Sequence, residues 1–164
     1  MRHFIIALAF VSGMICTERA VASEAESFHE YYSYFQGKWI FEEEGTETVV
    51  ECEDKATYNL CHGWGGQLNE FWGYDPVQKA WAGYGRAGDL SWEWVVDRPE
   101  GDALTAGVQS GFKGTMWRAD GTKILIRQVL NVVDKDNFLI EKRTRQTAGQ
   151  EEVAQPTIKA RRVQ

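Results

Sequence analysis

Short runs of strand-forming residues follow one another along most of this chain, and turn residues separate them. The runs cover residues 38–44, 47–53, 57–62, 68–74, 80–86, 90–97, 103–110, 114–119, 123–133, 138–144 and 156–163. Turn sequences such as Asp75-Pro76, Asp120-Gly121 and Asp134-Lys135-Asp136-Asn137 lie between them. Hairpins at this spacing predict an all-β fold, in which one antiparallel meander closes into a barrel or folds into a sandwich.

The first 22 residues have the pattern of a secretion signal peptide. A short polar start precedes an apolar run over residues 4–15, and Ala20-Val21-Ala22 matches the small-x-small site of a signal peptidase. The apolar run is too short for a stable transmembrane helix. Acylation of Cys16 is disfavoured, because Ile15 precedes it where a small residue is expected. The sequence therefore predicts cleavage after Ala22 and a periplasmic or secreted protein.

The remaining residues form one domain. Residues 23–36 are expected to form a leading helix, because Phe28, Tyr31, Tyr32 and Phe35 recur at helical spacing. Residues 37–164 carry the strand runs, with no internal repeat and no long linker. This length is sufficient for a single buried core.

Charge and cysteine content restrict the partners and the compartment. The net charge of −6 argues against binding to nucleic acid or to an anionic membrane surface. After removal of Cys16, Cys52 and Cys61 remain as an even pair. A hairpin turn near Ala56-Thr57 would place them opposite each other, and we expect a disulfide in an oxidising compartment. The alternative is a pair of small buried thiols.

Side-chain alternation along three neighbouring runs favours the closed barrel. With Trp72 opposite Trp81 and with Gly83 opposite Trp92, one face collects the residues Glu70, Trp72, Tyr74, Trp81, Gly83, Gly85, Trp92 and Trp94. Indoles beside glycines are typical of an interior in which glycine makes room for a large neighbour. The other face carries Arg86 and Glu93 and is the natural solvent side. A shift of one residue would exchange the two faces.

This alternation turns Glu70 toward the interior, among Trp72 and Trp92. A carboxylate there is costly unless it is paired or protonated, so Glu70 is a candidate for orienting a ligand or for acid-base chemistry. His62 could complete an acid-base pair with it. The alternatives are a hydrated Glu70 at the barrel mouth or one paired with Arg127, and an ordinary polar His62 at a strand end.

No motif in the sequence implies a cofactor or a metal. Gly83-Tyr84-Gly85-Arg86-Ala87-Gly88 matches Gly-x-Gly-x-x-Gly, but it lies between two strand runs, where no helix N-terminus can hold a pyrophosphate. The acidic residues from Glu42 to Asp54 alternate over both sides of a ribbon and indicate a solvated face rather than a calcium site. Likewise, Lys142, Arg143 and Arg145 are expected on one solvent-exposed face.

The two ends of the domain carry a signature of small barrels. Gly37-Lys38-Trp39 opens the first strand run, and Arg161 and Arg162 lie in the last. An arginine from the last strand can cover the indole of Trp39 and so plug one end of the barrel. Alternation with Ile158 and Ala160 favours Arg162 for this contact.

Together with Gly73-Tyr74-Asp75-Pro76 followed by Trp81, and with Asp120-Gly121, these residues resemble a bacterial family of lipocalin-like proteins of the calycin type, which has no established common function. The resemblance covers Phe35 to about Val163. It implies a single closed up-and-down barrel of eight to ten strands with a leading helix across one end. The cysteine pair is not a feature that this resemblance implies.

Three function classes remain open from the sequence. The first is a binding protein for a small apolar or aromatic molecule, which Trp72, Trp81, Trp92 and Trp94 would enclose and Glu70, Tyr74 or His62 would orient. The second is an isomerase, lyase or hydratase that uses Glu70 and His62. The third is a filled barrel that acts through its outer surface. The oligomeric state is left open.

Overall fold

The computed structural model describes residues 24–96, 98–145 and 150–163, and the predicted signal peptide lies outside these residues. Residues 24–31 are α-helical and continue into a 3-10 turn, η1 (Tyr32–Phe35). A second 3-10 turn is η2 (Trp64–Gly66). The strands are β1 (Gly37–Glu43), β2 (Thr46–Asp54), β3 (Tyr58–Gly63), β4 (Leu68–Asp75), β5 (Ala80–Ala87), β6 (Leu90–Val96), β7 (Gln109–Arg118), β8 (Lys123–Asp134), β9 (Asn137–Arg145), β10 (Val153–Ala154) and β11 (Ile158–Arg162). The expected leading helix is thus present as one α-helical segment and one 3-10 turn.

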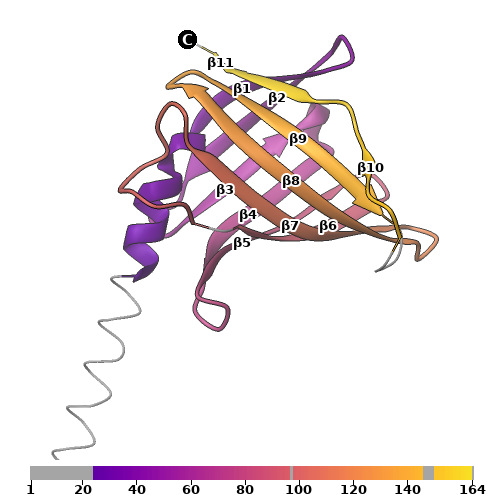
Figure 1. Cartoon of the computed structure of the whole chain (residues 1–164), viewed down its shortest axis with the longest axis horizontal. Helices are drawn as coiled ribbons and strands as arrows, with labels where there is room; N and C mark the ends of the chain where they lie inside the picture. The colour runs from indigo at the N-terminus through magenta and orange to yellow at the C-terminus, as the bar shows by residue number, and fades with distance from the viewer. Residues whose placement is uncertain (1–23, 97, 146–149, 164) are drawn as a thin grey trace, which may run out of the picture.

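The strands form a closed antiparallel barrel, which confirms the predicted fold class (Figure 1). Each strand from β1 to β9 pairs with the next, β9 then pairs with β11, and β11 pairs with β1. Within the described residues the ring has ten strands, and the two-residue β10 extends the edge of β9. This closure leaves no free edge along the main strands.

Side chains of the turns stabilise several of the hairpins. Asp75 accepts hydrogen bonds from the backbone N–H groups of Val77 and Gln78, at 2.8 and 3.2 Å. Asp120 accepts one from Thr122 at 2.8 Å. Such turns, in which an aspartate side chain binds the backbone two residues later, are the reason that Asp-rich segments separate the strands.

Two predicted strands are corrected by the structure. The expected strands over residues 103–110 and 114–119 are replaced by one strand, β7, which runs through Gly111 and Gly114. Residues 103–108 instead belong to the connection between β6 and β7, where Leu104 is buried in the core. The apolar residues of this segment were mistaken for a strand because they serve tertiary packing, and the glycines of β7 do not end it.

The leading helix closes one end of the barrel (Figure 1). Tyr32 stacks on Trp81 of β5, with ring centroids 5.4 Å apart, and the hydroxyl of Tyr34 donates to the carbonyl of Asp134 at 2.8 Å. Arg98, in the connection after β6, lies over the rings of Phe28 and Tyr31. The turns after β2, β4, β6 and β8 lie at this end. The turns after β1, β3, β5 and β7 therefore lie at the opposite end.

Candidate functional site

The interior of the barrel contains a cavity of about 1150 Å³. Rings of Tyr32, Phe35, Trp81 and Phe138 line it at the helix-covered end. At the other end its lining includes the exposed residue Glu44, so the cavity opens to solvent there. Ten strands enclose a wider interior than eight, and here side chains do not fill it. The filled-barrel alternative is therefore not supported.

One wall of the cavity carries the predicted indoles. Trp72 of β4 and Trp92 and Trp94 of β6 all line it, and their neighbours on the same face include Met116 and Phe112 of β7. Trp72 meets Phe112 edge to face, with centroids 5.8 Å apart. The face that was predicted to point inward is thus the face that lines the cavity. The wall formed by β8, β9 and β11 contributes the aliphatic side chains of Ile124, Ile126, Leu130, Ile140 and Ile158, together with polar residues such as Gln128 and Lys142.

The strand register within this wall differs from the expected one by two residues. Tyr74, not Trp72, is opposite Trp81, and Gly83 is opposite both Trp72 and Trp94. A shift of two keeps every side chain on its face, so the alternation was predicted correctly although the pairs were not. The length of each turn sets the pairing, and single residues do not reveal it.

Each of the three wall indoles covers a glycine on an adjacent strand. A Cβ added to Gly83 would lie 2.6 Å from the ring of Trp72, and one added to Gly85 would lie 2.4 Å from the indole nitrogen of Trp92. At Gly114 the corresponding distance to the ring of Trp94 is 2.2 Å. Real Cβ atoms do not approach other atoms so closely, and therefore these positions require glycine for the rings to lie against the wall.

Glu70 lies among these indoles. The Trp92 indole nitrogen donates to its Oε1 at 2.6 Å. Burial raises the pKa of the Glu70 carboxyl above its ordinary value, while hydrogen bonds from Trp72, Trp92 and Trp94 act to lower that pKa. Part of the side chain remains accessible because it faces the hollow interior, yet the surrounding protein displaces enough of its hydration to raise the pKa.

The structure separates Glu70 from His62. Cys61 is the cross-strand partner of Glu70, and His62, the next residue along β3, points to the opposite face. There His62 contacts Asn69 at 3.3 Å and lies 4.0 Å from a carboxylate oxygen of Glu53. The geometry therefore does not bring the two residues together as an acid-base pair.

Two other predicted residues lie at the closed end. Trp81 is buried beneath Tyr32 and forms part of the cavity floor. Tyr74 does not line the cavity, because its hydroxyl donates to Glu24 and its ring packs on Phe28 of the helix. Tyr74 thus helps to hold the helix on the barrel.

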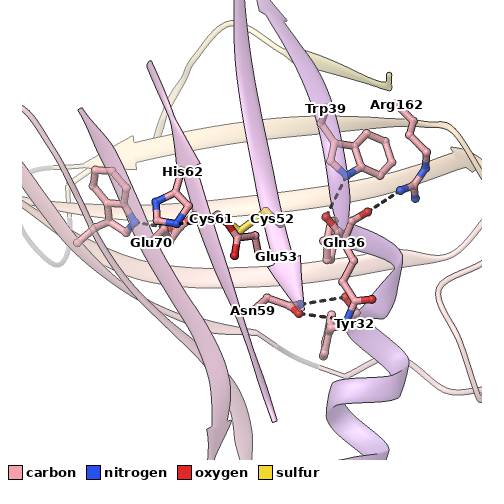
Figure 2. The surroundings of a disulfide bond; sticks show 12 residues. Tyr32, Gln36, Trp39, Cys52, Glu53, Asn59, Cys61, His62, Glu70 and Arg162 are labelled. Carbon is pink, nitrogen blue, oxygen red and sulfur yellow. Dashed lines mark hydrogen bonds and ion pairs between the residues drawn. A yellow bond between two sulfur atoms is a disulfide. The ribbon is translucent and has the colours of Figure 1, made fainter. Parts of the chain in front are cut away.

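The plug residues meet as the alternation suggested (Figure 2). The Arg162 guanidinium lies 4.2 Å from the centroid of the Trp39 ring, and it donates to the carbonyls of Gln36 and Tyr34 at 2.6 and 2.8 Å. The indole of Trp39 donates to the carbonyl of Phe35 at 2.9 Å. These bonds fix the segment that links the helix to β1.

Cys52 and Cys61 are cross-strand partners on β2 and β3, and their sulfur atoms lie at disulfide distance (Figure 2). Both side chains line the cavity near the closed end. Asn59, two residues before Cys61, accepts a hydrogen bond from Gln36 at 3.2 Å and donates to the carbonyl of Tyr32 at 3.5 Å. Sequence reasoning did not identify Asn59, because a lone asparagine in a strand carries no signal of its distant partners.

Lys142 was also placed incorrectly by the sequence. It lines the cavity and forms an ion pair with Glu43 of β1 at 2.5 Å, whereas its neighbour Arg143 is exposed. The alternation of Phe138 and Ile140, both of which line the cavity, could have placed Lys142 on the inner face. The expectation of one solvent-exposed face for Lys142, Arg143 and Arg145 was therefore wrong.

The described residues contain no group of three or more His, Cys, Asp or Glu side chains arranged for a metal ion. Nor is any helix in the described part of the chain long and apolar enough to cross a lipid bilayer. No protein-family model matches this chain, and no curated protein sequence matches it either.

Proposed function

We propose that this protein binds one small, largely apolar or aromatic molecule inside its barrel. The observation that carries the proposal is the cavity of about 1150 Å³, which is closed by the helix at one end and open at the other. Indole, phenyl and aliphatic side chains make up most of its lining, and most of its polar residues lie toward the open end. Cavities of drug-sized ligands reach about 1,000 Å³ and are likewise predominantly apolar.

The wall indoles supply the main contact area. Trp72, Trp92 and Trp94 are held against glycines, and so their rings line the cavity without blocking it. Aromatic surface of this kind binds apolar molecules by burial and stacking. An enzyme on the same barrel is less well supported, because Glu70 has no acid-base partner in His62.

The proposal includes an exported location and a lipocalin-like family membership. A cysteine pair at disulfide distance is typical of proteins of oxidising compartments. The sequence of residues 1–22 adds the signal-peptide pattern. The ten-stranded up-and-down barrel with a helix at one end is compatible with the family resemblance.

Native mass spectrometry of protein purified from its own periplasm tests for the bound molecule directly. An added mass of a few hundred daltons that is lost on denaturation is the expected result. The site is tested with N-phenyl-1-naphthylamine, a neutral dye whose fluorescence increases in apolar surroundings.

A matched pair of variants on β2 locates the dye. Thr48 lines the cavity, and the adjacent Val49 is 46% exposed on the outer face. Thr48→Trp should fill part of the cavity and weaken dye binding by about tenfold, whereas Val49→Trp should leave it unchanged. Equal binding by both variants, or no binding by the unmodified protein, would contradict a site inside the barrel.

A further inference from the structure

The carboxylate of Glu70 has no positively charged partner in the part of the chain that the structure describes. Among the described residues, no Lys, Arg or His forms an ion pair with it. Of the described residues that line the cavity, Arg118, Lys142 and Arg145 are basic, and Lys142 is already paired with Glu43. A buried carboxylate without a cation is costly to the free protein, and therefore a group that supplies the charge gains from binding there.

The surroundings of Glu70 orient it without neutralising it. The Trp92 indole nitrogen donates to Oε1 at 2.6 Å, and the neighbouring indoles of Trp72 and Trp94 also act to lower the pKa of the carboxyl. Indole N–H groups are donors only, so this cradle favours the ionised, acceptor form of the side chain. Burial opposes ionisation and raises the pKa of Glu70. A cation bound in the cavity would lower the pKa of Glu70 and favour its ionised form.

The same indoles provide a second attraction for a cation. Their rings lie against Gly83, Gly85 and Gly114 and line the cavity around the carboxylate. The face of an aromatic ring attracts an ammonium group within about 6 Å, and tryptophan does so best. A carboxylate within a group of indoles combines this attraction with an ion pair inside a partly enclosed cavity, where charge interactions are stronger than in bulk water.

We infer that the molecule bound in the barrel carries a protonated amine, which pairs with Glu70 while the apolar part of the molecule lies along the indoles. This inference rests on the proposed function and names the ligand class of the same site. A neutral carboxyl at Glu70 would instead donate a hydrogen bond to a carbonyl or hydroxyl oxygen, and the two ligand classes can be told apart experimentally.

Three probes of one shape separate the possibilities. Isothermal titration calorimetry at pH 7 compares 2-naphthylmethylamine, which is a cation, 2-naphthalenemethanol, which is neutral, and 2-naphthoic acid, which is an anion. We expect the amine to bind about tenfold more tightly than the alcohol, and the acid to bind most weakly. Equal affinities, or a preference for the alcohol or the acid, would overturn the inference.

The variant Glu70→Gln tests whether Glu70 is the source of the preference for the amine over the alcohol. The variant keeps an acceptor oxygen for the Trp92 indole, removes the charge, and should bind the amine and the alcohol equally within about threefold. The control is Glu93→Gln, which removes one charge from the exposed outer face of β6 between Trp92 and Trp94. It should keep the full preference.

The outcomes also separate this inference from the proposed function. If the amine preference survives in Glu70→Gln, or is lost in both variants, Glu70 is not the cation site, although the cavity still binds. If none of the three probes binds while N-phenyl-1-naphthylamine binds inside the barrel, the amine class is wrong and the proposed function stands. If the dye does not bind inside the barrel either, both proposals fail.

Discussion

The two ends of the barrel are built from different chemistry. At the closed end, aromatic rings of the helix pack on Trp81 and Phe138, and Arg162 donates to two backbone carbonyls. At the open end, the cavity lining consists of exposed or half-buried polar side chains such as Glu44 and Arg145, together with the rim residue Trp64, which is 45% exposed. Directional and buried contacts hold one end shut, while the other end leaves a path to the interior.

This difference indicates that the closed end mainly stabilises the fold, whereas the open end mainly controls access to the cavity. Substitutions at the closed end should change the free energy of unfolding, because they remove buried contacts. Substitutions at the open end should change access or affinity more than stability. The following experiments test this division, beginning with the variant of largest expected effect.

Of these variants, replacement of Trp39 should cause the largest loss of stability. Trp39 is 1% exposed and contacts Arg162, Tyr34 and Phe138. Trp39→Ala removes this packing and should lower the free energy of unfolding by about 3 kcal/mol or more in urea titrations.

Trp64→Ala is the matched control at the open end. Because nearly half of the Trp64 side chain is already in water, its removal should cost less than about 1 kcal/mol. Equal losses of stability in the two variants would show that the ends do not differ as proposed.

A smaller effect is expected at the arginine that covers Trp39. Arg162→Lys keeps the positive charge but loses the planar group that lies on the indole and donates to the carbonyls of Tyr34 and Gln36. The expected loss is about 1–2 kcal/mol in urea unfolding.

The neighbouring residue provides the control for this variant. Arg161 pairs with Glu47 on the surface at 3.1 Å, and both side chains are about half exposed. Arg161→Lys should therefore change stability by less than about 0.5 kcal/mol. If Arg161→Lys lost more stability than Arg162→Lys, the arginine that holds the closed end would be Arg161 and the assignment of this role to Arg162 would be wrong.

The wall and the plug were both predictable from the sequence, because each depends on local alternation. Indoles and glycines share one face of neighbouring strands, and this identified the inner face, since an indole can lie flat on the sheet only where its neighbour has no side chain. The predicted pairing of Gly83 with Trp92 was wrong, but the observed partners of Gly83, Trp72 and Trp94, lie on the same face. Alternation along the last strand likewise identified Arg162 as the residue over Trp39. Local periodicity is enough for such conclusions, since each requires only the face that a residue occupies.

Contacts between residues far apart in the chain could not be predicted from the sequence. Alternation along β9 sets the inward face of Lys142, but its ion-pair partner Glu43 lies 99 residues earlier and carries no local signal. The connection that buries Leu104 has the apolar composition of a strand, but its backbone bonds join it to β8 instead, with Gly107 donating to the carbonyl of Val132 at 2.8 Å. The hydrogen bond from Trp92 to Glu70 likewise follows from the register, which was predicted two residues away from the observed one.

The smallest expected effect is a gain of stability rather than a loss, and it results from the replacement of Glu70. Because burial raises the pKa of this carboxyl in the folded state, the native protein holds the proton to a higher pH than the unfolded chain does. Stability therefore falls as the pH rises through the unfolded value of about 4.3 toward the folded pKa, and the loss is complete above it. Glu70→Gln cannot ionise and escapes this loss.

The melting temperature of Glu70→Gln should accordingly exceed that of the unmodified protein at pH 7, and the difference should disappear near pH 4, roughly the unfolded pKa. Scanning calorimetry across this range, with Glu93→Gln as the exposed control, measures the effect. A residue that destabilises the free protein at neutral pH and yet faces the cavity is one whose charge serves binding rather than folding. If Glu70→Gln is less stable than the unmodified protein at pH 7, the indole cradle itself requires the carboxylate, and the wall around Glu70 belongs with the closed end as part of the framework.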